Sequence, residues 1–229
     1  MTRPDPLKLL DSVPLFAGLT TEDRKLLGPL CRVRAYDKGE IVFSEGAPAK
    51  ELCFVVLGRL KIVKSTPGRD LILGLFGPGE AVGMVAVFEG RPYPATAVAL
   101  EPSTVVHVPE HEFFAKLGDH AGLVKRLFQG LMTRQLELTK RLADLTGHVD
   151  ARIARLFLTL ADKAGRPEKT GIFIRIALTR QEIADLAATT VETAIRVMSR
   201  WGKDGVVETR EDGFFVPDVD ELKKHAAAG

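Results

Sequence analysis

Glu192 and Arg196 are four residues apart in a stretch that predicts a helix from about Thr190 to Trp201, so their side chains share one helix face. On such a face an arginine can donate two hydrogen bonds to O6 and N7 of guanine, and a glutamate can accept one from N4 of cytosine. The same pair also occurs on many solvated helices, where it contacts no base. The elements around the pair must decide between these roles.

The residues before this pair predict a second, shorter helix and a tight turn. Thr179 stands three residues before Glu182, which is the spacing of a capping box, and Ile183 and Leu186 give the helix an apolar face. Two short helices joined in this way form a helix-turn-helix, whose second helix enters the major groove of DNA. The predicted base-reading residues are therefore Val191, Glu192, Ile195 and Arg196.

Charge supports this interpretation only locally. A net charge of +2 on 229 residues is too small to indicate a nucleic-acid-binding protein. Between Thr193 and Lys203, however, the chain has three basic residues and no acidic one. Contacts with phosphates set the register of a protein on DNA without reading sequence. The residues predicted to make them are Thr179, Arg180, Gln181, Thr190, Arg200 and Lys203.

The flanking sequence predicts a winged helix-turn-helix domain over residues 147–229. Gly147 interrupts a helical pattern, and Asp150 is predicted to cap the next helix. One short strand is predicted over residues 172–176. Two more are predicted over residues 206–216 around Asp212-Gly213, a strong hairpin signal. These strands would frame the wing.

The first half of the chain predicts an antiparallel β domain at residues 1–118. Residues 33–108 hold short apolar runs separated by turns rich in glycine and proline. Residues 20–30 predict a short helix in front of these strands. The predicted fold class is α+β, with an N-terminal antiparallel β-roll of the double-stranded β-helix type and a C-terminal winged helix-turn-helix.

Residues 119–146 predict a long helix between the two domains. Its apolar residues recur every seven positions, the spacing of a coiled-coil seam, beside a polar flank. Such a helix can lie on its own β domain or pair with a second copy, and its length and polar flank favour a homodimer. The predicted dimer-interface residues are Val124, Leu127, Phe128, Leu131, Leu138, Leu142 and Leu145.

Composition places the chain among ordinary soluble globular proteins, with 45% hydrophobic and 27% charged residues. The N-terminus has no apolar signal segment, so a cytoplasmic location is expected. Cys31 and Cys53 lack metal-site spacing, and Cys53 lies in an apolar run that predicts a buried thiol. The sequence has no paired catalytic carboxylates, Ser-His-Asp order, phosphate loop or metal-ligand spacing, so we predict neither an enzyme nor a metal site.

Several motifs together carry a family resemblance over nearly the whole chain. They are Leu15-Phe16-Ala17-Gly18-Leu19, Lys38-Gly39-Glu40 with Glu45-Gly46, and residues 54–60, 179–184 and 191–196. In these motifs the chain resembles the CRP/FNR superfamily of bacterial transcription regulators, named after the cyclic-AMP receptor protein and the fumarate-nitrate regulator. The resemblance implies a dimer that binds double-stranded DNA and works with RNA polymerase.

The resemblance also assigns roles on the second helix. Glu192 and Arg196 fall where the family reads a TGA core in each half-site. Val191 resembles the FNR branch, because the cyclic-AMP branch has arginine there, and this implies a TTGA-like palindrome. Ile195 departs from the serine usual in the FNR branch, which leaves the outermost base of the half-site unassigned.

The predicted sensor departs from the family's nucleotide-binding members. They carry a glutamate that holds the ribose and an arginine that holds the cyclic phosphate. In the corresponding stretch here, residues 83–96, Met84 replaces the glutamate and Tyr93 the arginine. A buried phosphate would then lack its charge-assisted partner. The effector is therefore expected to differ from a cyclic nucleotide, with pocket candidates Met84, Tyr93, Pro94, Glu137 and Leu138.

Two alternatives of the same fold stay open. One is a cyclic-nucleotide-binding regulatory module, and the other is a regulator that senses gas through haem. The iron-sulfur cluster of the FNR branch needs four thiolates, and the chain has two cysteines. Haem is the cofactor that the composition leaves open, and no histidine lies in a recognisable axial-ligand motif. The histidines are His107, His111, His120, His148 and His225.

Overall fold

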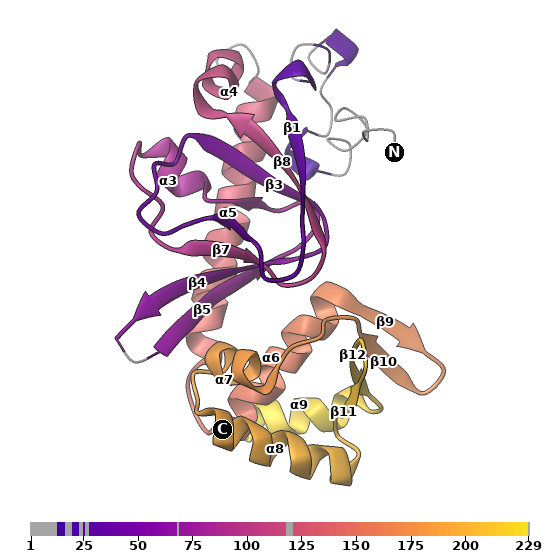
Figure 1. Ribbon diagram of the computed structural model, residues 1–229. Helices are drawn as coiled ribbons and strands as arrows, with labels where there is room; N and C mark the ends of the chain where they lie inside the picture. The colour runs from indigo at the N-terminus through magenta and orange to yellow at the C-terminus, as the bar shows by residue number, and fades with distance from the viewer. Residues whose placement is uncertain are drawn as a thin grey trace. The chain divides into compact units, whose positions relative to one another are not determined.

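A computed structural model describes residues 13–16, 20–22, 25, 28–67, 69–117 and 121–228 (Figure 1). The chain divides into two compact units, Met1–Arg134 and Gln135–Gly229. The division falls inside the long helix α5 (Ala121–Asp144), which begins in the first unit and ends in the second. The predicted long helix is confirmed, and its observed bounds are 121–144 rather than 119–146. No helix in the described part of the chain has the length and hydropathy of a membrane span.

The first unit contains two four-stranded antiparallel sheets, which confirms the predicted β-roll. One sheet has the order β1-β8-β3-β6, and the other has the order β2-β7-β4-β5. The strands of the first sheet are β1 (Arg32–Tyr36), β8 (Ser103–Pro109), β3 (Glu51–Leu57) and β6 (Ala81–Val82). The strands of the second are β2 (Ile41–Phe43), β7 (Thr96–Ala99), β4 (Leu60–Thr66) and β5 (Arg69–Phe76).

Strand β3 is buried on both faces. Successive side chains of a strand point to opposite sides, and here each side packs into a different apolar cluster. Cys53 and Val55 belong to an inner cluster that includes residues of both sheets, such as Leu60 and Ala97. Leu52 and Phe54 belong to a second cluster with residues of the helices. This strand therefore reads as a nearly continuous apolar run rather than as an alternating one.

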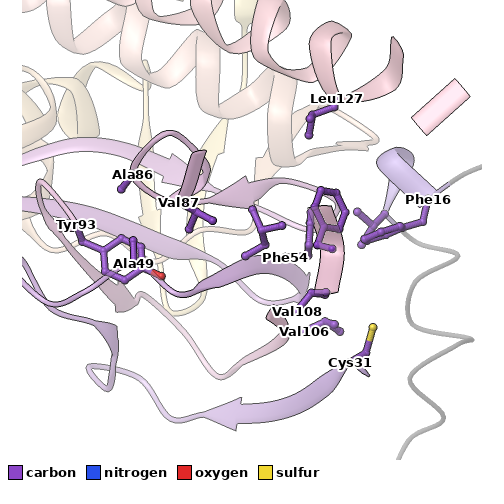
Figure 2. Close-up of a cluster of buried hydrophobic side chains, with 13 residues drawn as sticks. Phe16, Cys31, Ala49, Phe54, Ala86, Val87, Tyr93, Val106, Val108 and Leu127 are labelled. Atoms are coloured by element: carbon purple, nitrogen blue, oxygen red, sulfur yellow. The ribbon is translucent and has the colours of Figure 1, made fainter. Parts of the chain in front are cut away.

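The second cluster ties the helices of the first unit to the outer face of the β1-β8-β3-β6 sheet. Phe16 packs edge-on against Phe54 with ring centroids 4.9 Å apart (Figure 2). Leu127 of α5 is 3% exposed and lies on the helix side of the same cluster (Figure 2). The first third of α5 is thus anchored on its own β domain.

The other short helices of this unit are η1 (Pro14–Phe16), η2 (Gly28–Leu30), α3 (Met84–Phe88) and α4 (Glu110–Leu117). Helices α3 and α4 were not predicted, because both are shorter than the window over which helical periodicity is visible. The helix predicted over residues 20–30 falls partly outside the described residues, as do Ala17, Gly18 and Leu19 of the entry motif.

The second unit has the predicted winged helix-turn-helix. Its sheet has the order β11-β12-β10-β9, all antiparallel. The helices are α6 (Val149–Ala164), α7 (Arg180–Leu186), α8 (Val191–Asp204) and α9 (Val219–Ala227). The strands are β9 (Gly165–Glu168), β10 (Gly171–Ile174), β11 (Glu208–Arg210) and β12 (Gly213–Val216). Trp201 and Phe157 are fully buried in the core of this unit, where Phe157 packs edge-on against Phe214.

Three details of the second unit differ from the predictions. The N-cap of α6 is His148, and Asp150 lies in its first turn instead of capping it. The strand predicted over residues 172–176 ends at Ile174. Strand β9 and helix α9 were missed. Proline and charged residues make β9 polar, which suits an edge strand, because the periodic apolar signal comes only from buried faces.

Candidate DNA-binding surface and effector region

Helix α7 begins with the predicted capping box. The Thr179 hydroxyl accepts a hydrogen bond from the backbone N–H of Glu182 at 3.1 Å. The Glu182 carboxylate in turn accepts from the N–H of Thr179 at 2.9 Å and from its hydroxyl at 3.0 Å. Both donors of Thr179 are therefore used inside the protein. Its observed role is to start α7, and a phosphate would have to compete with Glu182 for either donor.

The turn between α7 and α8 has a left-handed backbone at Ala188, where φ is +50°. Thr189 donates from its N–H to the carbonyl of Ala184 at 2.9 Å, and Arg152 of α6 donates to the carbonyl of Ala188 at 3.2 Å. These bonds hold a conformation that costs an alanine free energy because of its Cβ. The turn therefore places α8 at a defined angle to α7.

Helix α8 is strongly two-sided. Thr190 caps it by accepting a hydrogen bond from the N–H of Thr193 at 3.3 Å. Ala194, Val197, Met198 and Trp201 are buried, and they anchor one face in the core of the second unit. The opposite face leaves Glu192, Ile195 and Arg196 exposed, and Val191 is half-buried at the first turn. The four predicted base-reading residues thus lie at the N-terminal half of α8, with three of them open to solvent.

The two charged residues of this group are not paired with each other. Arg196 forms no hydrogen bond or ion pair with any residue in the described part of the chain. The Glu192 carboxylate accepts hydrogen bonds from its own backbone N–H and from Thr190, and these bonds lower the pKa of Glu192. The face therefore presents an ionised acceptor and an uncommitted bidentate donor one helical turn apart.

The predicted phosphate-contacting residues differ in how far the protein already uses them. Arg180 donates to the Thr209 hydroxyl at 2.8 Å, and burial lowers its pKa. Gln181 donates to Asp185 within α7 at 2.8 Å. Arg200 is ion-paired with Asp150 of α6. Lys203 is exposed and forms no ion pair with a described residue. Of the four, Lys203 is the one with its charge fully available to a phosphate.

Arg210, which the sequence analysis did not single out, organises the wing. Its guanidinium lies 3.8 Å from the centroid of the Phe215 ring. It also bridges to Glu168 of β9 at 3.0 Å and to Glu208 at 3.6 Å. These partners come from three strands of the sheet. The charge of Arg210 thus serves mainly to hold these strands together.

In the β-roll, Tyr93, which was predicted to replace the family's phosphate-binding arginine, is buried. Its ring stacks on Phe43 with centroids 3.8 Å apart, and its hydroxyl donates to the Glu51 carbonyl at 2.9 Å. Burial raises the pKa of Tyr93. The residue therefore offers a neutral ring and a committed hydroxyl, and it lacks the fixed positive charge that a phosphate needs.

The remaining pocket candidates have other surroundings. Met84 is half-buried at the start of α3, and Pro94 is exposed, with its carbonyl accepting from Lys64 Nζ at 3.0 Å. Glu137 and Leu138 belong to the second unit. There Glu137 pairs with Lys163 of α6 at 3.0 Å, and Leu138 is exposed. Glu137 thus has an ionic role within its own unit.

A buried polar cluster in the roll was also missed. His107 is 7% exposed, and its Nε2 is hydrogen-bonded to the Tyr36 hydroxyl at 2.9 Å. Its Nδ1 lies 3.2 Å from Glu51 Oε2 and 3.5 Å from Cys53 Sγ. Burial lowers the pKa of His107, whereas burial raises the pKa of Cys53 to about 12 and that of Cys31 to about 11. The pairing of Cys53 with His107 comes from strands far apart in sequence, so no local motif signals it.

These values confirm that Cys53 is a buried, protonated thiol at neutral pH. The structure does not group three or more His, Cys, Asp or Glu side chains into a metal-binding arrangement anywhere among the residues it describes. His107 has both ring nitrogens within reach of protein partners. His120 lies outside the described residues.

Helix α5 requires one correction to the predicted dimer seam. Leu127 is packed into the core of its own β domain and is not available to a second copy. Phe128 and Leu142, in contrast, are 60% and 72% exposed. The exposed apolar side also contains Met132 and Leu136, which the heptad pattern did not include. The exposed apolar face therefore lies further around the axis of α5 from Leu127 than the predicted seam did.

Comparison with known proteins agrees with both halves of the fold. The cyclic nucleotide-binding domain matches residues 33–120, and the Crp-like helix-turn-helix domain matches residues 151–225. The chain is 25% identical over 193 residues to the "CRP-like cAMP-activated global transcriptional regulator" of Mycobacterium tuberculosis, covering 83% of this chain and 86% of that protein. It is 29% identical over 216 residues to "Transcriptional activator protein anr" of Pseudomonas aeruginosa, covering 93% and 87% respectively.

Solved structures give the same result. A CRP-family transcriptional regulator from Thermus thermophilus superposes with a TM-score of 0.74 at 25% identity, covering 86% of this chain and 97% of that one. These relatives are transcription regulators, and the name of one states that it is activated by cAMP, whereas the name of the other states no effector. Two matched domains in the same order and a fold shared over most of the chain identify this protein as a member of the CRP/FNR superfamily of transcription regulators, with a DNA-binding helix-turn-helix.

Proposed function

We propose that this protein is a homodimeric regulator that binds a TTGA-like palindrome through α8 and responds to an effector other than a cyclic nucleotide. The observation that carries the proposal is the exposed face of α8, where Glu192 and Arg196 stand one turn apart, with Arg196 unpaired among the described residues. Val191 and Ile195 complete the base-reading group.

The proposed readout follows from hydrogen-bonding capacity. Arg196 would donate to O6 and N7 of the guanine in TGA, and Glu192 would accept from N4 of the cytosine in the complementary strand. Lys203 would contact phosphate, together with Arg180, Gln181 and Thr190 near the helix starts and Arg200 once it is released from Asp150. Thr179 would contribute chiefly by fixing the start of α7.

The proposed homodimer rests on α5. Its exposed apolar residues would otherwise stay in water on a helix of 24 residues. A second copy related by a two-fold axis would cover the same face on each helix and place the two recognition helices on two half-sites. The seam we propose keeps the predicted residues except Leu127 and adds two exposed ones. It consists of Val124, Phe128, Leu131, Met132, Leu136, Leu138, Leu142 and Leu145.

The effector is proposed to be something other than a cyclic nucleotide, because Tyr93 is neutral, stacked on Phe43 and hydrogen-bonded to Glu51. One observation favours the alternative of a cyclic-nucleotide-binding regulatory module, namely the match of residues 33–120 to the cyclic nucleotide-binding domain. A haem-based gas sensor is a further alternative, and the absorption spectrum of freshly purified protein tests it through the presence of a Soret band. RNA polymerase is the proposed protein partner.

The test of the DNA-binding proposal is a competition series with labelled TTGA-N6-TCAA duplex. Unlabelled competitors carry single base-pair replacements at each position of one half-site, and the assay is repeated at two salt concentrations. We expect each replacement within TGA to weaken binding by about 1–3 kcal/mol. Equal competition by every duplex, including a scrambled one, would contradict sequence-specific recognition.

A further inference from the structure

Ile195 is an apolar side chain on a surface that otherwise consists of polar and charged groups. It is 46% exposed, and among the described residues of α8 it is the one large apolar side chain exposed to this degree. It lies three residues after Glu192 and directly before Arg196, so it lies beside the two charged side chains on the exposed face. An apolar group at this position has no hydrogen bond to offer a base.

The shape of the side chain makes it a defined contact surface. Isoleucine is branched at Cβ and keeps largely one χ1 rotamer in a helix, so its methyl groups are presented in a fixed direction. Ala194 and Val197 on either side are buried, and they fix the rotation of α8 about its axis. Ile195 would therefore bring the same apolar surface to the same base pair each time that α8 docks.

The major groove has one apolar base substituent, which is the C5-methyl group of thymine. We propose that Ile195 is a specificity-determining residue that packs on this methyl group, so that each half-site requires a 5-methylpyrimidine at one base pair beside those read by Glu192 and Arg196. This inference rests on the proposed docking of α8 in the major groove. The base is selected by burial of a methyl group, without any hydrogen bond from the protein.

The size of the effect follows from the transfer of one methyl group out of water, at about 0.8 kcal/mol. That corresponds to about fourfold in affinity for one half-site and about 15-fold when both half-sites of the palindrome lose the methyl group. Selection by a methyl group predicts that 5-methylcytosine satisfies the contact and that unmethylated pyrimidines do not.

The test replaces each thymine of the TTGA-type duplex in turn by deoxyuridine, which lacks the C5-methyl and keeps every hydrogen-bonding group. The wild-type protein is expected to lose about fourfold in affinity at one thymine per half-site. Ile195→Ser is expected to bind the thymine and deoxyuridine duplexes equally at that position. Ser199→Ala is the matched control, because Ser199 is exposed on α8 and is not among the proposed DNA-contacting residues, and this variant should keep the sensitivity.

The outcomes separate this inference from the proposed function. Specific binding that is indifferent to deoxyuridine at every position would overturn the role of Ile195 and leave the proposed readout by Arg196 standing. Sensitivity that persists in Ile195→Ser, or that disappears in Ser199→Ala as well, would also overturn it. Binding that does not distinguish the TTGA duplex from a scrambled one would overturn the proposed function and this inference with it.

Discussion

Two arginines of α8 illustrate how neighbours decide what a charged side chain can do. Arg200 is paired with Asp150, whereas Arg196 has no partner among the described residues. An arginine that is already paired must exchange one partner for another when DNA binds. An unpaired arginine gives up only its hydrogen bonds to water when it bonds to a base, so we assign the base contact to Arg196.

Replacing Arg196 by alanine should therefore remove discrimination at the guanine of TGA, at a cost of about 1–3 kcal/mol per half-site. Lys203→Ala is the matched control, since a phosphate contact carries no base information. That variant should weaken all sequences equally and lower the salt slope of binding by roughly one. Competition binding at two salt concentrations measures both effects. A variant Arg196→Ala that retains the wild-type preference for guanine would mean that α8 docks on another face.

The left-handed turn at Ala188 is a local cost that glycine would relieve. Ala188→Gly should stabilise the folded protein by about 1 kcal/mol, because a residue without Cβ adopts a φ of +50° with little strain. Ala187→Gly is the control. The neighbouring φ of −92° is ordinary for alanine, so the same change there should destabilise. Urea unfolding followed by circular dichroism compares the two. If both variants changed the free energy of unfolding equally, the backbone at Ala188 would not be strained.

At the scale of elements, α5 divides its apolar residues between two tasks. Leu127 anchors the helix on the β-roll of its own chain, and residues such as Leu138 and Leu142 leave an apolar face exposed. A helix face of this kind is stable in water when a partner covers it. The exposed residues therefore carry the proposed association.

Leu138→Asp combined with Leu142→Asp should convert the protein to a monomer, since each unpaired carboxylate in a seam costs about 3–5 kcal/mol. Thr133→Asp is the matched control, because Thr133 is exposed on another side of α5. Sedimentation velocity gives the oligomeric state, and the same samples are tested for DNA affinity. A dimer that survives both leucine replacements would locate the interface elsewhere.

At the scale of the whole molecule, stability should depend on pH through His107. Its pKa in the folded protein lies below the usual value, because the ring is buried beside Tyr36 and Cys53. The unfolded chain therefore takes up a proton near pH 6.5 before the folded protein does. The stability contributed by neutral His107 is present above pH 6.5 and is lost as the pH falls from there toward the folded pKa.

Urea unfolding at pH 7.5 and pH 5.5 measures this loss. We expect the wild-type protein to lose stability on acidification, and His107→Gln, which keeps hydrogen-bonding groups and does not titrate, to lose less. The groups facing His107 are Tyr36 on β1 and Glu51 and Cys53 on β3, with Arg32 and Arg34 of β1 nearby. An identical pH dependence in both proteins would assign the effect to another group.

The β-roll as a whole should also fail to bind cyclic nucleotides tightly. Cyclic AMP and cyclic GMP are expected to bind no better than millimolar, because Tyr93 offers no positive charge to offset burial of the phosphate. Isothermal titration calorimetry on the intact protein measures this directly. Micromolar binding of either nucleotide would contradict the proposed effector class and favour the alternative of a cyclic-nucleotide-binding module.

Local patterns were sufficient for the features in which a few neighbouring residues set the structure. The capping box of Thr179 and Glu182 was predicted from sequence and is present. The hairpin predicted around Asp212-Gly213 is also present, with its turn one residue earlier, at Glu211-Asp212. The order of a β domain, a long helix and a winged helix-turn-helix followed from periodicity and turn residues in the same way. Each of these depends on backbone conformations and hydrogen bonds within a few residues, so the information is contained in the local sequence.

The tertiary structure alone decided the features in which distant segments meet. Leu127 matches a coiled-coil seam as well as its neighbours do, and only the placement of β8 and β3 buries it in its own chain. Asp150, in the first turn of α6, pairs with Arg200, fifty residues away. His107 meets Cys53 because β8 and β3 are adjacent in the sheet. Such contacts depend on strand order and helix docking, and no local pattern encodes the partner because many sequences share the same periodicity.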